Sequence, residues 1–333
     1  MVPFAYRSFR DQARSAVKSS CDSPHKLTAL HVIITLGVGF LISLLTYFLN
    51  RGIAGSGGLG GIDRRTTLEF FQSMLRLISL IFLPFWSMGY LSAVLHLARG
   101  QDISRRDLLQ GFRQWGNILR TLLMQGMILF CTGYLGAQVG STLFLLTPSA
   151  QELLLLTEQM MEQGMSNMSE MMQDATYMRA MMPMIPWMVV GALALGVPAF
   201  YRTRFMRHVA LDHPERGGFF AMVCSFRMSK RRFWPLVLLD LRLWWYHGLQ
   251  LLALAIGCLD LLLPKLGISL SADPLVLALG CYGLSLLLRL AICTWKKAEV
   301  FSLYALVYDH IRTNDVPVTP KVPRPAKQVP WKY

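Results

Sequence analysis

The sequence predicts an all-α membrane protein, a polytopic bundle of about six transmembrane helices with basic amphipathic helices at the membrane surface. Three observations lead to this fold class. Hydrophobic residues make up 53% of the 333-residue chain and charged residues only 16%, whereas a soluble domain carries about 25% charged residues. The apolar residues gather in runs near the length of about 20 that a helix needs to cross the hydrocarbon core. The positive residues gather in the segments between those runs.

Six apolar runs define the expected spans. Lipid cannot hydrogen-bond a backbone amide, so each run should be a helix that satisfies its own backbone. The runs cover residues 27–49, 70–98, 118–146, 183–201, 234–263 and 274–295. We therefore expect one membrane domain over residues 1–312. A basic, proline-rich and disordered cytoplasmic tail should follow at residues 313–333.

The distribution of Lys and Arg predicts the orientation. The N-terminal segment, the second and fourth connections and the C-terminal segment together hold 25 of these residues, and the other three connections hold five. Positive residues accumulate on the cytoplasmic side, so we expect a multi-pass protein of the cell membrane with both termini in the cytoplasm. The net charge of +14 then serves contact with anionic inner-leaflet headgroups. No nucleic-acid-binding motif accompanies it, so we expect no nucleic-acid partner.

Basic segments before the odd-numbered spans are expected to lie as helices in the headgroup plane. In "DISRRDLLQGFRQWGNIL", Ser104 and Asp107 have the spacing of a capping box. An apolar stripe recurs at helical spacing through Leu108, Phe112, Trp115 and Leu119. The segments "GGFFAMVCSFRMSKRRFW" and "YRSFRDQARSAVKSS" have a similar character. The expected lipid-headgroup contacts are Arg105, Arg106, Arg113, Arg227, Lys230, Arg231 and Arg232.

A basic surface segment followed by two expected spans occurs three times along the chain. One interpretation is a set of three parallel repeats, over residues 1–98, 99–207 and 213–310. The other is that polytopic proteins in general collect basic segments at the interface.

Three stretches resemble segments of a bacterial integral-membrane family catalogued as domain of unknown function 975. They are "LARGQDISRRDLLQGFRQWGNILRTLL", "HVALDHPERGGFFAMVCSFRMSKRRFWPLVLLDLRLWWYHGLQLLA" and "KKAEVFSLYALVYDHI". The family pattern includes an Asp-x-Pro, matched by residues 212–214, a serine where Ser225 or Ser229 falls, and an aromatic where Phe301 and Tyr304 fall. Arg242 stands where such proteins tend to carry a small polar residue. The resemblance implies six membrane helices and no assigned activity, and residues 148–182 look like an insertion.

Charged residues inside the last two runs form a candidate polar site. Asp240 and Arg289 lie at similar distances from the cytoplasmic ends of their runs, and intramembrane charges usually pair or face a cavity. We therefore consider an Asp240–Arg289 pair, with Arg242 reaching the headgroups. The alternative is that residues 233–243 lie along the interface, with Trp244, Trp245 and Tyr246 in the aromatic belt.

The insertion at residues 148–182 is rich in methionine and expected outside the cell. Met161, Met165, Met168 and Met171 recur at helical spacing. Thioethers are soft ligands for Cu(I), but no His or Cys accompanies them. The alternatives are packing by flexible side chains and an adaptable surface for a membrane-protein partner.

Glycines on the third run predict a close helix contact. Gly136 and Gly140 are four residues apart and Gly133 lies near them. Small residues at this spacing allow the backbones of two membrane helices to approach each other.

The chain lacks the motifs of catalytic sites, and we expect no enzyme and no cofactor. The "GSGGLG" stretch at residues 55–60 has dinucleotide-loop spacing, but it follows an apolar run rather than a strand. The expected function is a non-enzymatic membrane component that organises lipid or partner proteins. The alternative is a transporter or channel subunit with a polar site near Asp240 and Arg289.

Overall fold

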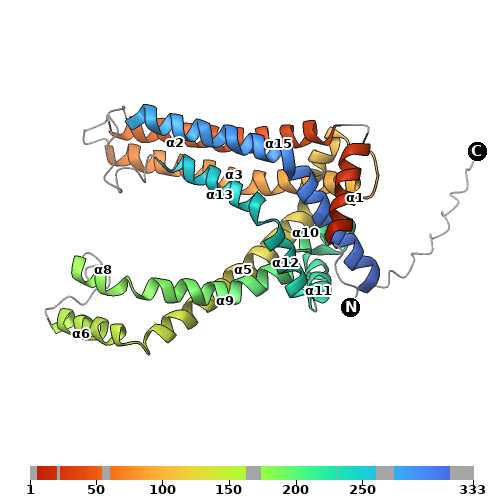
Figure 1. The fold of residues 1–333 in the computed structure, drawn as a ribbon. Helices are drawn as coiled ribbons and strands as arrows, with labels where there is room; N and C mark the ends of the chain where they lie inside the picture. Colours follow the sequence, from red (N-terminus) through yellow and green to blue (C-terminus); the bar gives the residue numbers. More distant parts are fainter. Residues whose placement is uncertain are drawn as a thin grey trace, which may run out of the picture. The chain divides into compact units, whose positions relative to one another are not determined.

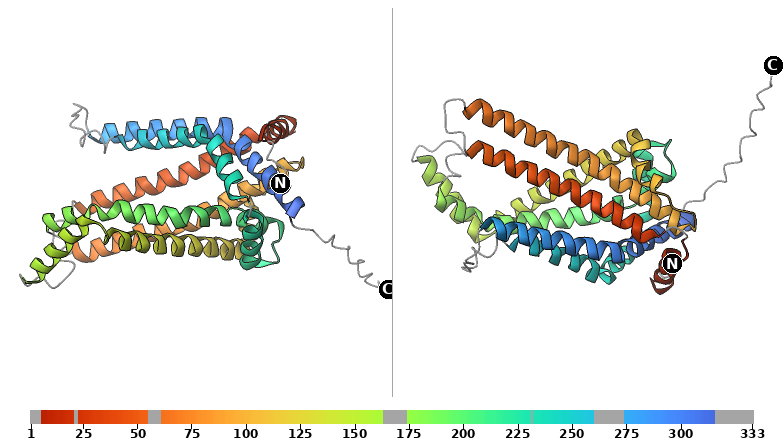
Figure 2. Two further views of the ribbon diagram at one scale, coloured as in Figure 1. Left: turned by 60° about the horizontal axis from the view of Figure 1, so that its bottom comes forward. Right: turned by 90° about the horizontal axis from the view of Figure 1, so that it is seen from above.

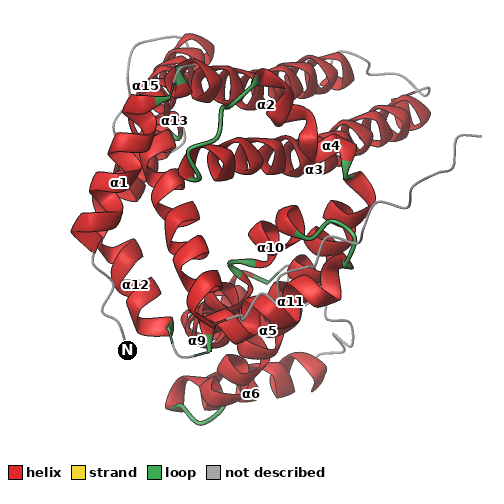
Figure 3. Ribbon diagram, turned by 90° about the vertical axis from the view of Figure 1, so that its right-hand side faces the viewer, coloured by secondary structure: helices red, strands yellow, loops and turns green. Residues whose placement is uncertain are grey.

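The computed structural model describes residues 6–20, 23–54, 61–162, 174–230, 232–259 and 274–315. Every regular element in these ranges is a helix and none is a strand (Figure 3), which confirms the all-α class. Four helical stretches are long and apolar enough to cross a membrane: Pro24–Thr46, Glu69–Ala98, Trp115–Phe144 and Ala175–Asp212. They coincide with the first four expected spans. The "GSGGLG" stretch lies outside the described residues.

The chain divides into two compact units, and the first comprises residues 1–118 and 237–333. Its long helices are α2 (Pro24–Ala54), α3 (Gly61–Ala98), α13 (Trp244–Gly257) and α15 (Pro274–Asp315). Helix α15 packs against the other three, and α2 packs against α3 (Figures 1 and 2). The short helix α1 (Tyr6–Ser19) lies against α15. The expected N-terminal surface segment is therefore a helix, held by a part of the chain far away in sequence.

A compact elbow follows α3 and consists of a 3-10 turn, η1 (Arg105–Leu109), and one α-helical turn, α4 (Gln110–Arg113). Two glycines let it contact α3 backbone to backbone. A Cβ on Gly89 of α3 would overlap the carbonyl group of Leu108, and a Cβ on Gly111 would overlap that of Phe85. The elbow is thus fixed to α3 by contacts that only glycine permits.

The ends of this elbow have well-formed caps. Helix α3 stops in a Schellman motif, in which Gln101 N donates to His96 O and Gly100 N to Leu97 O. Gly100 has a φ of +69°, which glycine adopts without strain. The Ser104 side chain and the Asp107 carboxylate then form the expected capping box at the start of η1. Asp therefore replaces the usual Glu at this position without loss of the motif.

The expected single amphipathic helix across this segment is wrong. The chain leaves helical geometry at Gln114 before α5 (Trp115–Phe144) begins. Leu108 is 1% exposed and Trp115 is 64% exposed, so the two do not share one buried face. The close packing of Gly89 in α3 against Leu108, and of Gly111 against Phe85 in α3, favours the tighter η1–α4 geometry over a regular helix.

The second unit covers residues 119–236, and in it the backbone of α5 approaches that of α9 (Met184–Thr203) closely at three glycines. A Cβ on Gly136 would lie 2.3 Å from Gly191 O, and one on Gly140 would lie 2.1 Å from Trp187 O. The expected glycine contact is confirmed at these two positions. It does not extend to Gly133, where a Cβ would meet nothing within 4 Å.

Two short helices at the other end of this unit come from the methionine-rich insertion. They are α6 (Pro148–Glu162) and α8 (Ala175–Met181). Met160 and Tyr177 are buried together, with Leu153 and Met181 packed against them. Here methionine fills a small apolar core, as its flexible thioether allows.

Helices α10 (Met206–Asp212) and α11 (Gly217–Ser229) follow α9 and pack against each other. Ser225 of α11 is fully buried. Its hydroxyl donates to Arg202 O at 2.6 Å and accepts from Phe205 N at 3.2 Å. One side chain thus satisfies two backbone groups at the break between α9 and α10, which explains why a serine stands there.

The fifth expected span is not one continuous helix. The chain turns at Leu243 between α12 (Phe233–Arg242) and α13, and residues 260–273 lie outside the described part. Each piece is shorter than the roughly 20 residues of a span. Helix α15, by contrast, has 42 residues. It continues past the expected sixth span and into the expected tail, as far as Asp315.

Candidate functional site

Asp240 is half-buried at the end of α12 and bonds to a tyrosine from α15. The Tyr304 hydroxyl donates to Asp240 Oδ1 at 2.8 Å and lies 3.5 Å from His247 Nε2. An aspartate, a tyrosine and a histidine therefore meet at the junction of three helices of the first unit. The resemblance had placed an aromatic at Tyr304, but 64 residues separate it from Asp240, so no local pattern links the two.

The expected Asp240–Arg289 pair stays a prediction. Arg289 Nε is buried and has no hydrogen-bond partner among the described residues. A buried guanidinium nitrogen without a partner is costly, so this position is one that a ligand or water would complete.

Arg242, two residues after Asp240, contacts helix α1. Its guanidinium carbon is 5.0 Å from the ring centre of Tyr6 in α1. The side chain is exposed. A cation over an aromatic face gains about 0.5–1 kcal/mol at an exposed site, so Arg242 helps to hold α1.

A carboxylate on α15 gathers the positive residues of α1. Glu299 accepts from Arg14 Nε at 2.7 Å and from Lys296 Nζ at 2.8 Å, and Arg10 Nε is 3.8 Å away. Burial alone would raise the pKa of Glu299, but the hydrogen bonds from Lys296 and Arg14 outweigh it and hold this pKa below its usual value. The same hydrogen bond raises the pKa of Arg14. Glu299 is therefore ionised at neutral pH and links α1 to α15.

A second carboxylate on α15 holds the end of α3. Arg99 donates from Nε to Asp309 Oδ2 at 2.9 Å and from Nη2 to Oδ1 at 2.8 Å. Arg312 Nη2 is 3.5 Å from the same Oδ1. Bidentate pairs of this kind fix orientation as well as adding energy. The last part of α15 therefore holds the end of α3 through Asp309. The distribution of Lys and Arg in the sequence predicts orientation and does not predict this ion pair.

Lys297 lies between aromatic rings, beside the first turns of α2 and the last turns of α3. Its ammonium is 4.9 Å from the ring centre of Tyr90 and 5.6 Å from that of Phe301. His31 stacks on Tyr90 at 4.3 Å, and the Tyr90 hydroxyl is 3.0 Å from Thr28 Oγ1. Burial lowers the pKa of Lys297 to about 8. When Lys297 is protonated, the rings of Tyr90 and Phe301 stabilise its ammonium by cation–π attraction.

The expected headgroup contacts are distributed over both units. Arg105, Arg106 and Arg113 are exposed on the elbow of the first unit. In the second unit Arg227 and Lys230 are exposed and Arg232 is half-buried, while Arg231 lies outside the described residues. For the five exposed ones, the described part of the chain provides no ion pair. These side chains are therefore available to an external anion.

The described residues do not form a recognisable metal site. No group of three or more His, Cys, Asp or Glu side chains is close enough to hold a metal ion there. Of the four methionines at helical spacing, Met161 is 62% exposed, and the other three lie outside the described residues.

Comparisons with known proteins give no match: no family model, no curated protein and no solved structure resembles this chain.

Proposed function

We propose that the chain is a non-enzymatic integral protein of the cell membrane that binds inner-leaflet headgroups through its basic helix ends and organises lipid or partner proteins. In this proposal six segments cross the membrane and both termini lie in the cytoplasm. The methionine-rich insertion then offers an exterior surface to a membrane-protein partner. Membership of the family catalogued as domain of unknown function 975 is part of the same proposal.

The observation that carries this proposal is the elbow after α3. It displays Arg105, Arg106 and Arg113 without an ion pair in the described part of the chain, and backbone contacts fix it to an apolar helix. Each cation near an anionic leaflet contributes about 1 kcal/mol of attraction. The apolar helices support a lipid environment, because α5 leaves side chains such as Phe130 and Met127 72% and 66% exposed. Such surfaces in water would be expected to aggregate.

The test combines topology and lipid content. Reporter fusions at the C-terminus and within residues 163–173 should report cytoplasmic and exterior positions, respectively. The full-length protein extracted in mild detergent should retain anionic phospholipid at a higher ratio than the membrane it came from. The R105Q/R106Q/R113Q variant should lose most of this enrichment. Retained lipid of the same composition as the bulk membrane would contradict the proposal.

A transporter or channel subunit is the second candidate, and the cluster around Asp240 favours it. Asp240, Tyr304 and His247 bring three groups that exchange protons within hydrogen-bond reach. Arg289, half-buried with its Nε fully buried, lies earlier on the same helix as Tyr304. Such groups in membrane helices often mark an ion or proton path. Proteoliposomes containing the protein should then leak protons or a solute faster than empty ones, and D240N should abolish the difference. Identical leak rates would exclude this candidate.

A further inference from the structure

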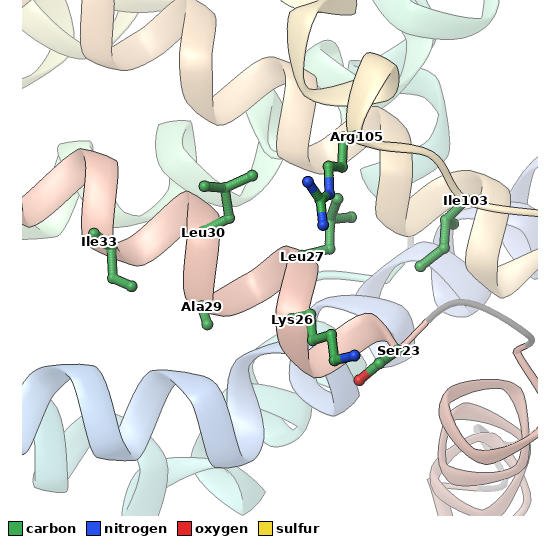
Figure 4. A pocket seen from close by; sticks show the side chains of 8 residues that line it. All are labelled: Ser23, Lys26, Leu27, Ala29, Leu30, Ile33, Ile103 and Arg105. Atoms are coloured by element: carbon green, nitrogen blue, oxygen red, sulfur yellow. The ribbon is translucent and has the colours of Figure 1, made fainter.

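A groove of about 430 Å³ lies beside the first turns of α2, where the segment between α3 and η1 passes (Figure 4). Its rim carries three polar side chains, and its floor is apolar. In Figure 4 the Lys26 ammonium points toward the Ser23 hydroxyl, and the Arg105 guanidinium points into the groove above Leu27. A volume of this size is within the usual range for small-molecule sites, about 300–1,000 Å³.

The rim carries two positive side chains. Among the described residues, no Asp or Glu lines the groove, and neither Lys26 nor Arg105 forms an ion pair. Arg14 and Arg99 of the same unit are paired with carboxylates on α15, so free cations are not a general property of this unit. Helix α2 also begins here, at Pro24, and adds the positive end of its dipole. The rim therefore suits an anion.

The apolar lining continues from the rim along α2. Leu27, Leu30 and Ile33 follow one another at intervals of three residues, so they extend about 9 Å along the helix at 1.5 Å per residue. Leu27 is 9% exposed and Ile33 is 54% exposed, so the described protein leaves this surface uncovered at its Ile33 end. It leads from the positive rim into the first apolar stretch, Pro24–Thr46. An apolar surface below a pair of cations matches a molecule with an anionic head and a hydrocarbon chain.

The backbone that carries Arg105 is fixed before any ligand arrives. Arg105 is the first residue of η1, where the capping box of Ser104 and Asp107 holds the backbone. The close approach of Gly111 to Phe85 holds the adjoining turn against α3. Only the rotamer freedom of the side chain is then lost when Arg105 binds an anion.

We infer that this groove holds one anionic phospholipid of the inner leaflet, with its phosphate between Lys26 and Arg105 and one acyl chain along Leu27, Leu30 and Ile33. The inference rests on the proposed function, since it assigns one defined site among the headgroup contacts. A free phosphate or an acidic peptide would leave the apolar floor uncovered. Two cations and an apolar surface that continues about 9 Å along the helix together select a lipid.

Native mass spectrometry of the full-length protein in detergent micelles tests this site. Dioleoyl phosphatidylglycerol and dioleoyl phosphatidylcholine are titrated against the wild type, K26Q/R105Q and R106Q/R113Q. Each cation near the anion is worth about fivefold in affinity, so K26Q/R105Q should weaken the first phosphatidylglycerol by about 30-fold. R106Q/R113Q also removes two positive charges, both on the elbow but outside the groove, and it should weaken that first lipid less than threefold.

Further arms separate the outcomes. K26R/R105K keeps the charge and should keep the affinity, and thermal melting confirms that each variant is folded. Millimolar inorganic phosphate should not displace the lipid; displacement would overturn the lipid assignment in favour of a phosphate site. Equal losses in the two glutamine variants would overturn the groove and leave the proposed headgroup binding intact. A wild type that binds phosphatidylcholine as tightly as phosphatidylglycerol would overturn both.

Discussion

Replacing Gly140 with Ala should force α5 and α9 apart. A Cβ at this position would lie 2.1 Å from Trp187 O and 2.7 Å from the carbonyl carbon of Trp187. Carbon and carbonyl oxygen approach each other to about 3.3 Å at closest in helix–helix contacts, so the backbones must separate by about 1 Å. Both groups in the clash belong to backbone, and no change of side-chain rotamer can relieve it.

The expected cost follows from two opposing effects. Overpacking of a well-packed contact costs about 1–3 kcal/mol, and Ala is favoured over Gly in a helix by about 1 kcal/mol. Gly133→Ala on the same helix is the matched control, because a Cβ there meets nothing within 4 Å. It keeps the propensity gain without the clash. The difference in unfolding free energy between the two variants therefore measures the contact alone, about 1–3 kcal/mol.

The assay is reversible unfolding of the detergent-solubilised protein in a denaturing detergent, followed by far-ultraviolet circular dichroism. G140A should unfold at the denaturant fraction of the wild type or below it, and G133A should unfold at a higher fraction than G140A. If the two variants unfold at the same point, the glycine contact between α5 and α9 is refuted.

Three other substitutions probe the clamps of the fold by the same assay. D309N should destabilise the protein by about 1–2 kcal/mol, because it weakens the bidentate pair between Arg99 and Asp309. The control D102N changes an exposed acid outside any ion pair of the described residues, and it should have no effect. Equal unfolding curves for D309N and D102N would contradict a stabilising role of the Arg99–Asp309 pair. S225A should cost about 1–3 kcal/mol of unfolding free energy, because it leaves two buried backbone groups unsatisfied. S229A should cost less, because the Ser229 hydroxyl donates to Ser225 O within the same helix. A larger loss in S229A than in S225A would contradict the proposed role of Ser225 at the break between α9 and α10. Lys297 has a pKa of about 8 when folded against 10.5 when unfolded, so the native state releases its proton first and stability should rise between about pH 8 and pH 10.5, by up to about 3 kcal/mol. K297M should remove this rise, and parallel pH profiles of variant and wild type would show that Lys297 does not cause it.

The sequence predicts the long helices well because lipid-length apolar runs are a local signal. The runs at 70–98 and 183–201 correspond to the apolar stretch Glu69–Ala98 and to α9, Met184–Thr203, within two residues at each end. The capping box is also local, and it was predicted from the spacing of Ser104 and Asp107. These features depend on residues only three or four positions apart, or on composition alone.

Contacts between distant segments could not be predicted in this way. The geometry of the elbow after α3 depends on the close backbone contacts of Gly89 and Gly111. Apolar residues at helical spacing do not predict these contacts. The resemblance implies an aromatic where Phe301 and Tyr304 fall, but the bond of Tyr304 to Asp240 depends on the meeting of two helices, because the two residues are 64 positions apart. Arg105 was expected to reach headgroups, whereas the groove it forms with Lys26 depends on how α2 packs beside the elbow.

The link between Arg14 and Glu299 has a consequence for biosynthesis. The two residues are 285 positions apart in the chain, and ribosomes add about 5–20 residues per second. The first helix to leave the ribosome must therefore wait about 15–60 seconds for its docking partner. Throughout that interval α1 depends on other surfaces, such as the bilayer or a chaperone, to shield its apolar side. Attachment of the earliest segment is thus among the last events of folding, and chains released before residue 299 should retain an undocked, protease-sensitive N-terminus.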